Sequence, residues 1–241
     1  MRYSFLLIII VLIQFNVHAQ KDTIVFNSFI VRFDNNYMIA ESKNNSTIYK
    51  KQFNLPYYYT VDADGDGLVE LVVVDSVVSD TKTTFYIYIY SGTHEFKLVD
   101  SIYSSTYFPC LSYAEEISSI IIETGNPDFE IFNERGESSS LPINVWKMED
   151  EKIILVNDEV YEPFLFENAN YVLLLDYYLG SDSAECDEVS TQKGIIASAY
   201  ANYINAGELS LGENFLNKYY TCPDKLDFKQ QILDLIFPKA K

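Results

Sequence analysis

Histidine is almost absent from this chain of 241 residues, which contains only His18 and His94. Catalytic triads and zinc sites built from several histidines are therefore nearly excluded, and we expect His94 to be an exposed turn residue. Positive charge is scarce as well, because 17 Lys and Arg residues stand against 35 Asp and Glu residues, for a formal net charge of −18. Nucleic-acid binding needs a surface that neutralises phosphates, so we set this function aside.

Long apolar runs are missing except at the N-terminus. Residues 5–13 are all apolar and follow Arg2, and Val17 and Ala19 stand at positions −3 and −1 of a signal-peptidase site. A membrane-spanning helix needs about 20 apolar residues, so we predict a cleaved signal peptide at 1–19, with an uncleaved anchor as the alternative. Cleavage would leave 222 of the 241 residues, no membrane span and, with Arg2 lost, a charge of −19.

The abundance of Tyr, Asn and Ile and the Ala19-Gln20 junction resemble exported proteins of Gram-negative bacteria. This resemblance implies a location in the periplasm or on the cell surface. Cysteine is rare, with only Cys110, Cys186 and Cys222, and an odd number in an oxidising compartment leaves at least one thiol unpaired. We predict a bridge between Cys186 and Cys222, with no bridge at all as the alternative, and a free thiol at Cys110.

Short β-type runs separated by turn residues fill residues 20–160, without an internal repeat. Residues 83–90 alternate strictly, with Phe85, Ile87 and Ile89 on one face and three tyrosines on the other. We interpret most tyrosines as packing residues, and a tyrosine-lined face that binds sugar or peptide is the alternative. The expected strands are residues 23–33, 37–41, 47–53, 57–61, 71–74, 83–90, 95–102, 118–123, 143–148 and 152–156.

Between residues 161 and 241 the apolar residues recur at the three- to four-residue spacing of helices. Apolar residues recur at helical spacing over 195–204, and Gly207 suits the end of that helix. Ser210 and Glu213 form a capping box that predicts the start of the next helix, and a third apolar stripe at 228–236 stops before Pro238. Residues 168–179 fit a helix or a buried strand. The predicted fold class is α+β, with an antiparallel β-rich domain at 20–160 followed by a small helical domain at 161–241.

The hairpin at 193–220 resembles one tetratricopeptide-type unit. The resemblance depends on six positions, Tyr203, Gly207, Gly212, Leu216, Tyr219 and Pro223. Such units usually need at least three copies to bury a continuous core. We therefore interpret this segment as a helical hairpin that packs on the β-rich part.

An aspartate loop at residues 62–70 is the one motif that carries chemistry. Carboxylates stand at positions 1, 3, 5 and 9 of the loop, the carbonyl of Leu68 is at position 7, and Gly67 permits a sharp bend. These oxygens can surround a hard cation, and without one the carboxylates repel each other. Calcium suits the loop better than magnesium, which prefers a small octahedron with several waters. We predict a calcium site formed by Asp62, Asp64, Asp66, Leu68 and Glu70, with a solvated Asp-Gly turn as the alternative.

The flanks of this loop distinguish it from an EF-hand. Val73 stands where the EF-hand has its bidentate Glu, and β-type runs replace the two helices. The spacing at 62–70, followed by an apolar strand and the aromatic strand 85–90, resembles the calcium-binding FG-GAP or VCBS unit, although Glu70 replaces the usual Asp. The pattern at 86–96 and 146–156 is similar to small periplasmic proteins related to bacterial lysozyme inhibitors. The resemblance implies a compact, twisted β-domain over about 57–156, whereas a complete propeller would need about four to eight blades.

These observations favour an exported, non-catalytic, calcium-stabilised binding protein. No catalytic residues are predicted, since no nucleophile elbow or histidine pair is present. The expected partner is a basic protein, because a strongly acidic surface speeds encounter with positive charge, and a carbohydrate ligand stays open. The alternative is an exported hydrolase of the glycosidase type that uses Asp or Glu carboxylates, which a convergent acidic pair in a cleft would favour.

Overall fold

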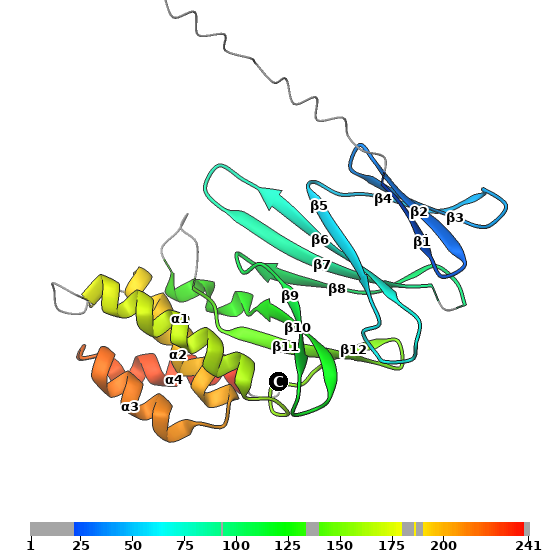
Figure 1. Cartoon of the computed structure of the whole chain (residues 1–241). Coiled ribbons are helices and arrows are strands. Elements are labelled where there is room, and N and C mark those ends of the chain that lie inside the picture. Colours follow the sequence, from blue (N-terminus) through cyan, green and yellow to red (C-terminus); the bar gives the residue numbers. More distant parts are fainter. Residues whose placement is uncertain (1–21, 93, 134–139, 180–185, 187–189, 239–241) are drawn as a thin grey trace, which may run out of the picture.

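Four layers follow one another in chain order in the computed structural model (Figure 1). It describes residues 22–92, 94–133, 140–179, 186 and 190–238. Three four-stranded sheets, here named A, B and C, are followed by a layer of helices. The predicted signal peptide at 1–19 lies outside the described residues. The β-rich segment followed by a helical one confirms the coarse α+β prediction.

Sheet A is an antiparallel meander in which each strand pairs with the next one in the sequence. Its strands are β1 (Asp22–Phe26), β2 (Phe29–Asp34), β3 (Tyr37–Glu41) and β4 (Thr47–Gln52). The single strand predicted at 23–33 is wrong, because Asn27 adopts a φ of 52° and the chain reverses there into a hairpin. The expected turn between the strands predicted at 23–33 and 37–41 is confirmed, since Asn35 and Asn36 both have positive φ, as a tight hairpin requires.

Sheet B repeats the meander with β5 (Pro56–Val61), β6 (Glu70–Val78), β7 (Thr83–Ser91) and β8 (Lys97–Ser105). Sheet C does so with β9 (Cys110–Ala114), β10 (Ser119–Gly125), β11 (Ile143–Glu149) and β12 (Lys152–Leu155), in the order β12-β11-β10-β9. Strand β9 and the 3-10 helix η1 (Pro127–Phe132) were not predicted. All the pairings within these sheets are antiparallel.

Sheet B is covered on both faces, and its strand β6 shows how the sheets are stacked. Leu71 and Val73 point into the core shared with sheet A, whereas Val72 and Val74 point into the core shared with sheet C. Strand β7 alternates as predicted, since Ile87 and Ile89 face sheet C. Its tyrosines Tyr88 and Tyr90 pack toward sheet A, where the Tyr90 ring contacts Tyr49 and Phe96. These two tyrosines therefore pack in the core between sheets A and B.

The helical layer comprises α1 (Glu162–Leu179), α2 (Thr191–Asn205), α3 (Leu209–Tyr219) and α4 (Lys225–Ile236). Helix α1 resolves the ambiguity at 168–179 in favour of a helix, and it begins six residues earlier. Gly207 has a φ of 74°, as expected for the end of α2. The capping box is wrong: α3 begins at Leu209 with no side-chain cap, because the turn at Gly207 places Glu208 at the N-cap and Ser210 inside the helix.

The helices cover the outer face of sheet C. Phe164 of α1 enters the core formed by Ile121 and Val145, and the Asn202 side chain of α2 accepts a hydrogen bond from the backbone N–H of Ile143 at 3.0 Å. The predicted disulfide between Cys186 and Cys222 is present, and Cys110 is free. A disulfide is compatible with export. In the part of the chain that the structure describes, no helix is long and apolar enough to span a membrane.

Candidate metal centre

The aspartate loop connects β5 to β6 in the middle sheet. Gly65 and Gly67 have φ values of 76° and 87°, so the loop makes two bends that residues with a Cβ rarely adopt. Gly67 was expected to permit such a bend, and Gly65 contributes a second one. These bends fold the loop back so that its acidic residues return toward the first residue of β6, Glu70.

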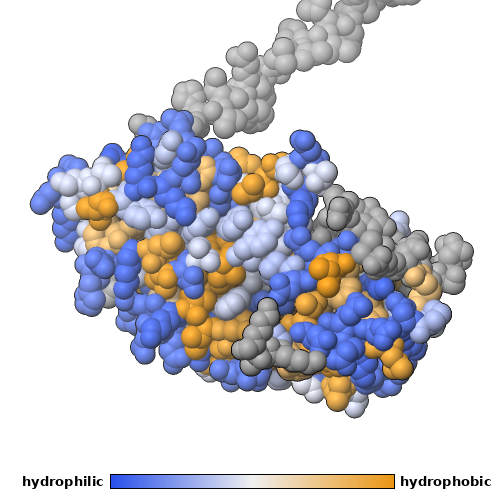
Figure 2. Space-filling model, turned by 180° about the vertical axis from the view of Figure 1, so that it is seen from behind, coloured by the Kyte–Doolittle hydropathy of each residue, from blue (hydrophilic) through white to orange (hydrophobic). Residues whose placement is uncertain are grey.

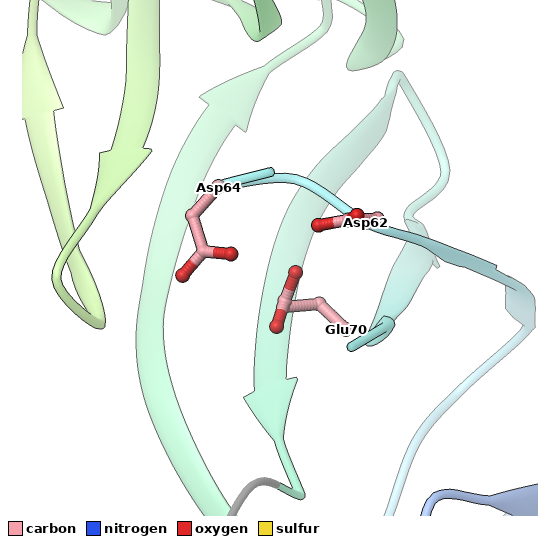
Figure 3. A group of neighbouring side chains, drawn as sticks. All are labelled: Asp62, Asp64 and Glu70. Atoms are coloured by element: carbon pink, nitrogen blue, oxygen red, sulfur yellow. The ribbon is translucent and has the colours of Figure 1, made fainter. Parts of the chain in front are cut away.

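Three carboxylates converge in this loop. Oxygen atoms of Asp62, Asp64 and Glu70 all lie within 4.8 Å of one another, and Figure 3 shows the three side chains turned toward a common space. Hard cations such as calcium take carboxylate oxygens as ligands, and calcium tolerates irregular geometry. The arrangement therefore offers one oxygen from each of three residues to a single ion.

Glu70 is the most buried of the three, with 1% of its surface exposed. Its Oε2 accepts a hydrogen bond from the backbone N–H of Ala63 at 2.8 Å, which leaves its other oxygen for another partner. Burial, together with the charges of Asp64, Asp66 and Asp62, raises the pKa of this carboxyl from its ordinary value of 4.5 to about 7. Burial also raises the pKa of Asp64. Burial and mutual repulsion thus destabilise the ionised forms of these carboxyl groups, and a bound cation would offset that destabilisation.

The aspartates also order the backbone of the loop. Asp62 accepts hydrogen bonds from the N–H groups of Gly65 at 2.9 Å and Gly67 at 3.1 Å. Asp66 is exposed, accepts from the Leu68 N–H at 2.7 Å, and does not belong to the converging group. The structure therefore brings together three of the five predicted ligands, and the roles of Asp66 and of the Leu68 carbonyl stay predictions.

The loop also contacts the sheets on both sides of sheet B. Ala63 is buried in the core between sheets B and C, whereas Val69 packs against the core between sheets A and B. Asn27, in the hairpin of sheet A, donates a hydrogen bond from Nδ2 to the carbonyl of Val69 at 3.1 Å. Sequence reasoning missed Asn27, because a contact across 42 residues leaves no local pattern. A cation that fixes the loop would therefore stabilise the packing of the three sheets against one another.

The variant Glu70→Gln separates electrostatic strain from ligand binding. Between pH 4.5 and about 7, Glu70 binds more protons in the folded protein without metal than in the unfolded chain. The stability of the wild type therefore falls as pH rises through that window. At pH 8 in a chelator, the neutral amide should therefore give a higher Tm than the wild type, and the difference should shrink toward pH 5. With calcium, the variant should show no rise in Tm. The exposed residue Glu95 provides the control Glu95→Gln, and a lower Tm of Glu70→Gln in chelator at pH 8 would contradict the prediction.

The remaining predicted feature, His94, lies exposed in the turn between β7 and β8, as expected. Comparison of the chain with models of known protein families and with curated proteins finds no match.

Proposed function

We propose that the protein is an exported, non-catalytic binding protein whose β-rich part is stabilised by one calcium ion in the loop at 62–70. The observation that carries this proposal is the convergence of Asp62, Asp64 and buried Glu70 within 4.8 Å. The ion would act as a structural element, since the loop contacts the cores on both faces of sheet B.

The resemblance of the loop to FG-GAP and VCBS units agrees with this proposal. Propeller blades are four-stranded sheets, and each of the three sheets here is a four-stranded meander that packs against its neighbour in the chain. The aspartate loop joins the first two strands of the middle sheet, β5 and β6. This arrangement supports a calcium-dependent β-architecture, with helices in place of further blades on the outer face of sheet C.

Calcium binding can be measured directly by calorimetric titration of the metal-free mature protein. We expect one calcium ion per chain for the wild type and for the control Asp100→Asn, which alters an exposed aspartate on β8. We expect no measurable binding for Asp64→Ala. Equal binding by Asp64→Ala and by the wild type would place the ion elsewhere.

A basic protein is the proposed partner, and export to the periplasm or cell surface is the proposed location. The charge of −19 after signal removal provides a strongly negative surface that attracts positive partners over a distance. Figure 2 shows one face of the molecule, on which apolar patches lie among largely hydrophilic side chains. Such a mixture of apolar and charged surface suits contact with another protein.

Association with a basic partner should depend on salt mainly through its rate. When the salt concentration rises from about 0.05 M to about 0.5 M, screening should slow association at least ~10-fold, while dissociation should change much less. The measurement is surface-binding kinetics with a panel of basic secreted proteins and an acidic protein of similar size as the control. The absence of any basic binder, or an association rate that ignores salt, would contradict the proposal.

A further inference from the structure

A pocket of about 400 Å³ lies between the edge strand β9 of sheet C and the start of helix α1. It combines acidic and aromatic side chains. Aromatic rings that include Tyr113 and Phe166 line it together with four glutamates, which are Glu116, Glu123, Glu162 and Glu167. We name it the glutamate pocket. Among the residues that the structure describes, none of those lining it is Lys, Arg or His.

The electrostatics of the glutamate pocket favour a positively charged guest. Burial raises the pKa of Glu167, and the neighbouring charge of Glu123 raises it further. Burial and the same Glu123 raise the pKa of the Cys110 thiol, which also lines the pocket, to about 12. Negative charge is thus already unfavourable inside this space, so a cation with an apolar stem would relieve the repulsion.

Glu116 gives an independent indication of a missing partner. Its Oε1 accepts hydrogen bonds from the backbone N–H groups of Tyr161 at 3.2 Å and Glu162 at 3.1 Å at the start of α1. Its Oε2 is buried and has no hydrogen-bond partner in the described part of the chain. A buried carboxylate oxygen normally has a donor, so Glu116 adds an uncompensated negative acceptor to the wall of the pocket.

Helix α1 extends the pocket into an apolar surface. Phe166, Leu173 and Tyr177 are exposed by 75%, 69% and 81%, and their spacing places them on one side of the helix. The opposite side carries buried Phe164, Tyr171 and Leu175. Phe166 belongs both to this exposed apolar face and to the lining of the glutamate pocket. The two features therefore form one continuous surface, with negative charge at one end.

We propose that this surface is the docking site for the basic protein partner. The partner inserts a Lys or Arg side chain into the glutamate pocket and lays an apolar segment along Phe166, Leu173 and Tyr177. The inference rests on the proposed function only in taking the partner to be a basic protein. It adds the place of contact and the order of residues that the partner must present.

A labelled peptide with a single arginine followed by leucine and phenylalanine provides the probe, and the same peptide with citrulline replaces the charge by a neutral isostere. Fluorescence anisotropy measures its binding to the wild-type protein and to Glu123→Gln/Glu167→Gln. The variant Glu95→Gln/Asp100→Asn removes the same charge from exposed positions on or beside sheet B. We expect the pocket variant and the citrulline peptide each to weaken binding at least ~10-fold, and the control to change it less than ~2-fold.

The apolar face is tested by Leu173→Ser/Tyr177→Ser against Leu226→Ser, which alters an exposed leucine on α4. We expect weaker binding only for the α1 variant, and slower alkylation of Cys110 when peptide is bound. Equal losses for the pocket variant and its charge-matched control, equal binding of the citrulline peptide, or no binding of the arginine peptide would overturn the inference. If basic proteins bind the wild type and the pocket variant equally well, the docking site is wrong and the proposed function stands.

Discussion

Calcium at about 100 times its dissociation constant should stabilise the mature protein by about 2.7 kcal/mol. In a chain of this size each kcal/mol shifts Tm by about 2–4 °C, so the expected rise is about 5–10 °C. The physical reason is that the ion neutralises the repulsion among Asp62, Asp64 and Glu70, of which Glu70 is buried in the core. Magnesium at the same concentration should give no comparable rise, because it retains its waters and prefers a small octahedral site.

Differential scanning calorimetry with calcium, magnesium and chelator provides the measurement. Asp64→Ala should lose most of the calcium-dependent rise, because it removes one of the three converging carboxylates. Asp100→Asn, an exposed substitution on β8, should keep the full rise. Superimposable melting curves in calcium and in chelator would refute the metal site, whatever the behaviour of the variants.

The double variant Cys186→Ser/Cys222→Ser should lose about 3–4 kcal/mol of the free energy of unfolding, since the bridge closes a loop of 36 residues. The bridge connects exposed Cys186, between α1 and α2, to buried Cys222, between α3 and α4. Without it, the unfolded chain regains the conformational entropy that the closed loop removes, and Tm should fall by roughly 10 °C.

Denaturant unfolding under non-reducing conditions measures this loss. Cys110→Ser is the matched control, because it replaces the free and half-buried thiol on β9 without touching the bridge. A reducing agent should lower the stability of the wild type to that of the double variant and leave the double variant unchanged. A loss below about 1 kcal/mol would mean that the helical layer is held by its packing alone.

Local patterns predicted the parts of the fold that depend on neighbours in sequence. The strict alternation at 83–90 matches strand β7, and three carboxylates of the acidic loop lie within 4.8 Å of one another. The disulfide prediction succeeded because only three cysteines were available, two of them in the helical region. The hairpin at Asn27 was missed, since the apolar residues on both sides of it read as one continuous strand.

The assembly of the layers depends on contacts that leave no local trace. Strand β9 has the mixed sequence Cys-Leu-Ser-Tyr-Ala, and it is a strand because it pairs with β10. The glutamate pocket combines Glu116 and Glu123 from one sheet region with Glu162 and Glu167 from a helix about 40 residues later in the sequence. Neither pair forms a motif on its own, so only the folded chain brings the four glutamates together.

The order of the layers suits the direction in which a polypeptide is made. Within each sheet every strand pairs with its neighbour in sequence, so each sheet can form as soon as its own segment has emerged. The apolar face of sheet A is covered by the segment that emerges next, and sheets B and C are covered in the same way. The helices, with both bridged cysteines, come last. Assembly can therefore proceed from the N-terminus with each apolar face exposed only briefly, and oxidation of the bridge marks its completion.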